Sequence, residues 1–391
     1  MKDFIFSTDK KSIIGITDKQ IQHITIPSDI EVIGEKAFEN CSLLESVEMP
    51  PSITNIEDYA FAGCSSLKTI DLPPGVIHIG IGAFRDCSSL RSIDMPDSLT
   101  TIGALAFDLC SKLEEVYLPS NLYEIEDGTF TNCEALKKVR FPSKLRVVGE
   151  CAFGSCTSLE QVSFPNTVEQ IKDRAYVGCI NIKEINIPIR VCSIGTCALE
   201  TSDSLGNSSL SNIIVDKDNQ MYSSAHGILY DKKKMTVVKM PPDKEINTIT
   251  LPESVNKIGV CSFSECKHLV KIELSPKTQE ICDEAFFYSH SLQFITMSDS
   301  ITKIGDFAFA GTAIKSIVIP QSVDEIGTQI FYECSALEEI RCKMEDLDNL
   351  KIKEKNSLCP NKTCKLIVPS GTRWAYKHHP VWGKFKQIEV E

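Results

Sequence analysis

The sequence predicts a β-rich α/β solenoid, in which short coils of chain stack on one another. The first observation is an interval of 23 residues between successive cysteines, which are Cys41, Cys64, Cys87, Cys110, Cys133, Cys156 and Cys179. The second is a row of prolines at the same interval, namely Pro50, Pro73, Pro96, Pro119, Pro142, Pro165 and Pro188. Self-similarity at a fixed period of about 20 to 50 residues is the signature of a repeat array.

The strand of each unit is predicted by alternating apolar residues. The unit can be written I-G-x-x-A-F-x-x-C-x-x-L-x-x-I-x-L-P-x-x-V, and its L-x-x-I-x-L part has the period of a β-strand. In one copy we therefore expect Leu67, Ile70 and Leu72 to point inward. Thr69 and Asp71 should then point outward to solvent.

The rest of the unit is predicted from the residues that follow the strand. Pro73 should end the strand, because proline has no amide hydrogen to donate to a neighbouring strand. A second short strand is expected around Val76 and Ile79, and Gly80 is expected to permit a turn. A short helical turn should then place Phe84 in the interior.

The units cannot be stable singly, since each exposes one apolar face until a neighbour covers it. Every inward Leu, Ile or Phe contributes roughly 1.5 to 3 kcal/mol when it is buried by stacking. About twelve such coils are recognisable between Ile30 and Cys342. The chain of 391 residues is therefore expected to form an elongated array rather than one compact core.

These motifs resemble a known family. L-x-x-I-x-L at a 23-residue period is similar to leucine-rich repeats, and A-F-x-x-C with I-P-x-x-V-x-x-I-G resembles the BspA-like class. The ending CKLIVPSGTRWAYKHHPVWGKFKQIEVE is similar to the C-terminal cap of that class. The resemblance implies a right-handed leucine-rich repeat array, found in surface or secreted proteins that bind host or bacterial proteins. It implies no enzyme activity and supplies no catalytic residues.

The expected organisation has five segments. Residues 1–29 form an N-terminal hairpin cap, 30–215 a first repeat block, 216–250 an inserted hairpin, 251–342 a second repeat block and 343–391 a C-terminal cap.

The inserted segment HGILYDKKKMTVVKMPPDKEINTITLPESVNKIG resembles the opening DFIFSTDKKSIIGITDKQIQHITIPSDIEVIG, with Ile249 and Pro252 matching Ile24 and Pro27. It is either a second cap or a loop insertion in a continuous array, and the break in the period is where a hinge is expected.

The charge balance excludes some partners. With 53 acidic and 41 basic residues the net charge is −12, so the chain repels phosphate backbones and no nucleic-acid partner is expected. No apolar run reaches the roughly 18 residues of a membrane span.

Family resemblance indicates a cell-surface or secreted location. The start MKDFIFSTDKKSIIG lacks an export signal, which leaves a cytoplasmic location as the alternative.

The cysteines that recur every 23 residues are predicted to be buried side chains that pack in the interior. Free cysteine behaves as a small buried hydrophobe, and Ser289 and Thr312 take the same place in later units. A required disulfide or metal ligand would not permit those replacements.

The nearest approach to a metal set is Cys359, Cys364, His378 and His379, whose spacing is not a usual zinc pattern. We predict no metal and no cofactor, and expect a disulfide among Cys342, Cys359 and Cys364 if the protein is exported. No catalytic motif is present, so the chain is not expected to be an enzyme.

The predicted partner-binding residues are the outward places on successive first strands. In leucine-rich repeats these places line the concave face. They are Glu48, Asp71, Asp94, Glu115, Tyr117, Lys138 and Arg140. The early coils are acidic and the fifth coil is basic, which predicts a face that orients a protein partner. The protein itself is expected to be a monomer. The alternatives are a solvated face with no partner and a glycan-binding surface protein. The latter would show exposed aromatic clusters, and only two tryptophans, Trp374 and Trp382, are present.

Overall fold

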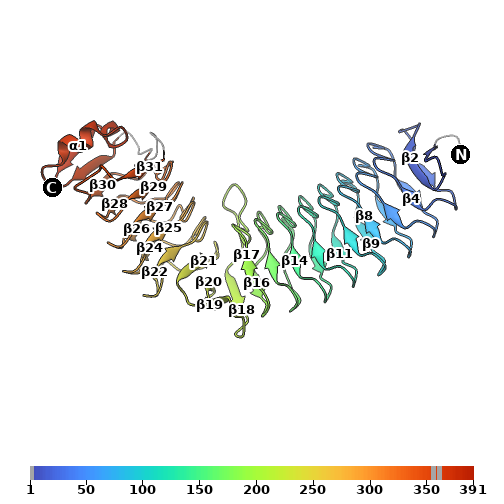
Figure 1. Ribbon diagram of the computed structural model, residues 1–391, viewed down its shortest axis with the longest axis horizontal. Coiled ribbons are helices and arrows are strands. Elements are labelled where there is room, and N and C mark those ends of the chain that lie inside the picture. The colour runs from blue at the N-terminus through green and yellow to red at the C-terminus, as the bar shows by residue number, and fades with distance from the viewer. Residues whose placement is uncertain (1–3, 354–357, 359–362) are drawn as a thin grey trace. The chain divides into compact units, whose positions relative to one another are not determined.

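The structure is a computed structural model, and it describes residues 4–353, 358 and 363–391. The chain divides into two compact units. Unit 1 contains Met1–Ser209 and Asp218–Gln220, and unit 2 contains Leu210–Lys217 and Met221–Glu391. Each unit consists of short coils stacked side by side, with one or two short strands in each coil (Figure 1).

The predicted solenoid is confirmed, with two corrections. The solenoid has about 16 turns instead of about twelve, because the expected number counted only coils with a recognisable motif. Within the described residues, regular helix is confined to α1 (Arg373–His378) and the 3₁₀ helix η1 (Trp382–Lys384). The helical turn expected at Ala83 and Phe84 is instead a non-helical turn, in which the Arg85 amide donates to the Gly82 carbonyl at 3.0 Å.

One row of strands in unit 1 consists of mostly two-residue strands. The antiparallel hairpin β1 (Phe4–Phe6) and β2 (Ser12–Ile16) begins a six-stranded sheet. The sheet continues in parallel with β4 (Val32–Ile33), β6 (Asn55–Ile56), β8 (His78–Ile79) and β10 (Thr101–Ile102). A four-stranded parallel sheet follows, made of β12 (Glu124–Ile125), β14 (Val147–Val148), β15 (Gln170–Ile171) and β17 (Ser193–Ile194).

The other row in unit 1 contains the L-x-x-I-x-L segments. Parallel pairs join β3 (His23–Thr25) to β5 (Ser46–Glu48), β7 (Thr69–Asp71) to β9 (Ser92–Asp94), and β11 (Glu115–Tyr117) to β13 (Lys138–Arg140). The next coil has only an isolated bridge from Val162 to Ile185 of β16 (Glu184–Ile187). In β7, Ile70 is buried while Thr69 and Asp71 are exposed, which confirms the predicted alternation.

Unit 2 repeats this arrangement. Its longest sheet contains β19 (Tyr222–Ala225), β20 (Ile228–Asp231), β21 (Thr236–Lys239), β23 (Lys257–Ile258), β25 (Glu280–Ile281), β27 (Lys303–Ile304), β29 (Glu325–Ile326) and β31 (Lys351–Ile352). The other row contains β22 (Thr248–Thr250), β24 (Lys271–Glu273), β26 (Phe294–Thr296), β28 (Ser316–Ile319), β30 (Glu339–Cys342), β32 (Lys365–Val368) and β33 (Gln387–Val390). The unit also holds β18 (Asn212–Val215).

The opening hairpin and the middle hairpin have the same pairing pattern. β1 pairs antiparallel with β2 with a register shift at Ile5/Phe6, and β2 then pairs in parallel with β4. β20 likewise pairs antiparallel with β21 with a shift at Leu229/Tyr230, and β21 then pairs in parallel with β23. Unit 2 adds one further antiparallel strand, β19, in front of this hairpin.

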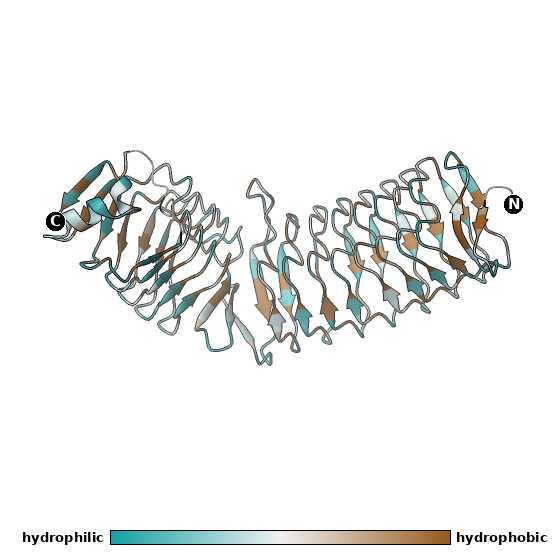
Figure 2. Ribbon diagram, turned by 45° about the horizontal axis from the view of Figure 1, so that its top comes forward, coloured by the Kyte–Doolittle hydropathy of each residue, from teal (hydrophilic) through white to brown (hydrophobic). Residues whose placement is uncertain are grey.

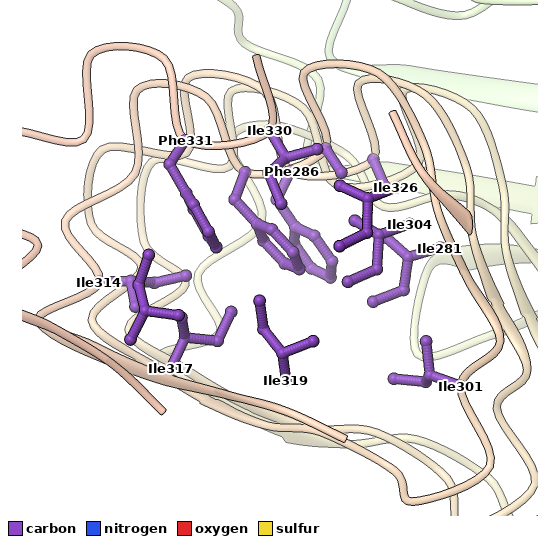
Figure 3. Close-up of a cluster of buried hydrophobic side chains, with 14 of the residues drawn as sticks. Ile281, Phe286, Ile301, Ile304, Ile314, Ile317, Ile319, Ile326, Ile330 and Phe331 are labelled. Atoms are coloured by element: carbon purple, nitrogen blue, oxygen red, sulfur yellow. The ribbon is translucent and has the colours of Figure 1, made fainter. Parts of the chain in front are cut away.

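The interior of unit 1 is organised by a column of aromatic rings. Phe38, Phe61, Phe84, Phe107, Phe130, Phe153 and Tyr176 stack at centroid distances of 5.1 to 5.5 Å with nearly parallel planes. All of these side chains are fully buried. In unit 2, Phe286 lies between the row Ile281, Ile304 and Ile326 on one side and Phe331 on the other (Figure 3).

The glycine of the Ile-Gly motif is required by a close approach between coils. The amide of Ile81 donates to Asp58 Oδ1 of the preceding coil at 2.7 Å. A Cβ atom on Gly80 would lie 2.5 Å from that oxygen and 2.5 Å from the Asp58 amide nitrogen. Gly80 does precede a turn, and its carbonyl accepts from the Ala83 amide at 3.3 Å, but its φ angle is not in the left-handed region. The close approach between coils, and not a left-handed backbone, is therefore what requires glycine here. Residues with a positive φ angle occur elsewhere in the coils, for example Leu105 and Leu109.

Candidate partner-binding surface

The seven predicted partner-binding residues all lie exposed on the strand row of unit 1 that contains β5, β7, β9, β11 and β13. The middle residue of each of these strands is buried, so the residues on either side of it face solvent. We call the exposed places of this row the strand face of unit 1. It comprises Glu48, Asp71, Asp94, Glu115, Tyr117, Lys138 and Arg140, together with Gln161 and Ser163 of the next coil.

The acidic part of the strand face is not neutralised by any described residue. Asp71 and Asp94 are direct neighbours in the parallel register of β7 and β9. Like charges in register on adjacent strands are destabilising. No lysine, arginine or histidine nitrogen of the described residues lies within 4.0 Å of either carboxylate. Folding thus places two uncompensated carboxylates side by side.

The basic part begins on the adjacent pair of strands. Lys138 lies beside Glu115 and Arg140 beside Tyr117 in the register of β11 and β13. The Tyr117 hydroxyl donates to Glu115 Oε2 at 2.8 Å, and this bond raises the pKa of the phenol. Over the residues that the structure describes, neither Lys138 nor Arg140 has a carboxylate within 4.0 Å. Lys137, by contrast, lies 3.5 Å from Glu114.

A hollow opens in the strand face next to this basic part. It has a volume of about 660 Å³ and is lined by Tyr117, Lys138, Arg140, Phe141, Gln161 and Ser163, among others. A second hollow of about 320 Å³ also contacts Gln161 and Ser163 and extends to Asn186. Gln161, Ser163 and Asn186 are outward places of the same strand row, but they were not among the predicted partner-binding residues. The signal that could have located the hollow is the pair Phe141 and Phe164.

Phe141 and Phe164 occupy the strand place that is leucine or methionine in the four preceding coils, as at Leu118. Their rings stack at 5.8 Å, and each packs edge-on against the interior column, Phe141 on Phe153 and Phe164 on Tyr176. In the described structure, strand pairing is absent between β13 and residues 161–163, as it also is between β5 and β7 and between β9 and β11. Phe141 itself lines the hollow, so the larger side chains lie where the face opens.

The cysteine column is buried, as predicted, and it also has a polar role that was not predicted. Cys110 Sγ donates to the carbonyl of Phe84 in the preceding coil at 3.2 Å, and Cys64, Cys87, Cys133 and Cys156 make the equivalent bond. Ser289 donates in the same way to the Phe263 carbonyl, so serine fits this place because it keeps the donor. Burial raises the pKa of these thiols, which opposes the thiolate that a nucleophile or a metal ligand requires.

The C-terminal segment does not bring its predicted ligands into a common site. Cys364 is buried, His378 Nδ1 lies 2.8 Å from the Trp374 carbonyl, and His379 Nδ1 accepts from the Val381 amide. Cys359 lies outside the described residues.

The disulfide expected in this segment does not form between Cys342 and Cys364. Cys342 and Cys364 are both free thiols, and both are buried in the core of unit 2. Pairings that involve Cys359 lie outside the described residues.

Hydrophilic and hydrophobic segments are interspersed along the coils of each unit (Figure 2). None of the helices in the described part of the chain has the length and apolarity needed to traverse a bilayer.

The stacked coils with short parallel strands and buried Leu, Ile and Phe columns define a leucine-rich repeat protein. A family model described as "BspA type Leucine rich repeat region (6 copies)" matches residues 17–137, 79–206, 124–228 and 242–355. The chain therefore belongs to the BspA-type leucine-rich repeat family.

Solved structures of similar proteins agree with this assignment. A leucine-rich cell surface protein from Faecalibacterium prausnitzii is 27% identical, with 99% of this chain and 92% of that chain covered and a TM-score of 0.67. A leucine-rich repeat protein from Bacteroides ovatus is 25% identical, with 100% and 91% covered and a TM-score of 0.58. The pneumococcal vaccine antigen PcpA shares the fold at 20% identity, with 97% and 94% covered and a TM-score of 0.59. No functionally curated protein matches the chain.

Proposed function

We propose that this protein is a non-enzymatic interaction module that binds a protein partner on the strand face of unit 1. The observation that carries the proposal is the uncompensated charge of that face. Asp71 and Asp94 are like charges in register, and Lys138 and Arg140 have no carboxylate within reach in the described structure. Such an arrangement costs folding free energy and is relieved when a complementary surface binds.

The family assignment supports this proposal and adds a location. Leucine-rich repeat arrays present long rows of exposed strand residues, which suit protein recognition. We propose a location at the cell surface or outside the cell, on the basis of the family and of the Faecalibacterium prausnitzii relative, a cell surface protein.

The test is a binding screen with the purified full chain immobilised. Host extracellular matrix proteins and intact bacterial cells are applied to the wild type, to Lys138→Glu/Arg140→Glu and to Asp71→Asn/Asp94→Asn. A partner that uses the strand face should lose about tenfold or more in affinity with at least one double variant. Capture that is equal for all three proteins would contradict the proposal.

Glycan binding is the second candidate, and one observation in unit 2 favours it. Phe287, Tyr288 and His290 form edge-to-face contacts with centroid distances of 4.4 and 5.2 Å, and Phe307 contacts Tyr332 in the same way at 6.3 Å. All five side chains are at least partly exposed. An exposed aromatic group of this kind offers ring faces for sugars, as the glycan hypothesis requires.

A glycan array probed with the wild type and with Tyr288→Ala/Tyr332→Ala separates the two candidates. Signals that disappear in this double variant and persist in Lys138→Glu/Arg140→Glu would favour glycan binding through unit 2. An array without signals would remove this second candidate.

A further inference from the structure

We propose that the hollow beside β13 binds an extended segment of a protein partner that carries carboxylate side chains at alternate residues. The inference rests on the proposed function, since it names the chemistry that the strand face recognises. It differs from that function by committing to one part of the face and to one class of partner segment.

The charge of the hollow selects an anionic ligand. Lys138 and Arg140 both line it, and neither has a carboxylate within 4.0 Å in the described structure. Lys137 and Glu160 complete the charged lining, so three cations face one carboxylate in the hollow, although the chain has a net charge of −12. Arginine and lysine donate charge-assisted hydrogen bonds to carboxylates, and such bonds are roughly twice as strong as neutral ones.

The spacing of the lining residues selects an extended peptide. Lys138 and Arg140 are two residues apart on one strand and both point outward, so their backbones are separated by about 6.6 Å along the strand. A bound segment in β-conformation presents alternate side chains at the same spacing of about 6.6 Å. Aspartates or glutamates at alternate residues can therefore meet both cations at once.

The opposite wall carries Glu160 and, at the same spacing as Lys138 and Arg140, two neutral partners. Gln161 and Ser163 line the hollow across from β13 and are likewise two residues apart. Their amide and hydroxyl groups can bond the backbone or the second carboxylate oxygens of the segment. Phe141 forms part of the apolar lining, and Tyr117 stands at the edge toward the acidic coils.

The acidic coils beside the hollow would orient the segment. Glu115, Asp94 and Asp71 follow one another away from β13 along the strand row. A segment with its carboxylates in the hollow is repelled by these groups if it continues over them with negative charge. The segment is therefore expected to be neutral or basic on that side.

The test uses defined probes and fluorescence anisotropy with the full chain. The probe is a fluorescein-labelled peptide of about 12 residues with aspartate alternating with serine, a length that exceeds the hollow at about 3.3 Å per residue. Matched peptides replace aspartate by asparagine or by lysine, and unlabelled hyaluronate is the competing carboxylated polysaccharide. The aspartate peptide should bind saturably, and its affinity should fall as salt is raised.

Two variants and one control locate the binding. Lys138→Glu/Arg140→Glu should lower the affinity by about tenfold or more, as expected when two charge-assisted contacts are reversed. Lys112→Glu/Arg190→Glu makes the same charge change at exposed places with no ion pair in the described structure, and it should change the affinity by less than about twofold. Phe141→Leu introduces the side chain found in earlier coils and should weaken binding with no change in charge. Circular dichroism confirms that each variant is folded.

Each outcome decides one question. Equal losses in the two charge-reversal variants, or no effect of Phe141→Leu, would overturn the hollow as the site. Stronger competition by hyaluronate than by the unlabelled aspartate peptide would replace the protein segment by a glycan. Failure of the aspartate peptide to bind would also overturn the inference. The proposed function would still stand if the screened partner remained sensitive to Asp71→Asn/Asp94→Asn, and would fall with the inference if no partner responded to either double variant.

Discussion

The ring column of unit 1 predicts that Phe107→Ala is among the most damaging substitutions in the interior. Phe107 is fully buried and stacks on Phe84 and on Phe130, at 5.4 Å in both cases and with interplanar angles of 7° and 4°. Replacing a buried phenylalanine by alanine costs about 3 to 5 kcal/mol. Because two ring pairs are lost at roughly 0.5 to 1.5 kcal/mol each, the expected cost lies toward 5 kcal/mol.

The control Phe107→Leu separates stacking from volume. Leucine fills most of the space but cannot stack, so its cost should be about 1 to 3 kcal/mol, the value of the two ring pairs. Both variants are measured by urea unfolding and by hydrogen exchange of individual amides. The opening free energy of the Phe84 and Phe130 amides should fall with that of residue 107, while the amide of Phe286 in unit 2 should be unaffected.

The reasoning would be refuted by either of two results. A cost below about 1.5 kcal/mol for Phe107→Ala would mean that the coils collapse around the missing ring. Equal costs for the alanine and leucine variants would mean that ring stacking contributes nothing beyond volume.

Four further predictions concern the thiols and the coil contacts. In the reduced native protein, iodoacetamide should modify the exposed Cys192 well before the buried Cys87, and equal rates by mass spectrometry would contradict the burial of the column. Because burial raises the pKa of Cys87 and its neighbours, folding favours the neutral thiol, so stability is retained below the unfolded pKa of about 8.5 and lost above it. Urea midpoints measured under reducing conditions from about pH 7.5 to about pH 10 should therefore fall, and a flat profile would count against this linkage. Cys110→Ser should cost less than Cys110→Val in thermal unfolding, by about 1 kcal/mol, since serine keeps the donor to the Phe84 carbonyl, and the opposite order would show that packing alone governs this place. Gly80→Ala should destabilise by more than the same change at Gly371, where an added Cβ meets nothing within 4 Å, although the positive φ of Gly371 adds its own strain.

The residues that point inward could be predicted from the sequence because a two-residue period has only two faces. Ile70 and Asp71 therefore fall on opposite sides wherever the strand begins. The partners of those residues could not be predicted in the same way. The thiol of Cys110 was expected to be packing, and its bond to Phe84 depends on the exact distance between coils.

The hollow shows the same limit for the candidate site. The sequence predicted the outward places and their change of charge, including Lys138 and Arg140. It did not predict an opening, because a phenylalanine at place 141 is compatible with either a wider coil or a deeper side chain. Only the positions of Phe141 and Phe164 against the interior rings show which of these occurs.

The thiol bonds also bear on how such an array can change its length during evolution. Each bond from Cys64, Cys87 or Cys110 reaches back 26 residues, which is one 23-residue period plus three. Duplicating or deleting one whole unit restores the same donor and acceptor between the new neighbours. Cys334 keeps the equivalent bond to Phe309 across 25 residues, so a coil that is shorter by one residue also retains it. Gains and losses of whole units therefore keep the interior bonds intact, and each such change adds or removes one step of the exposed strand row.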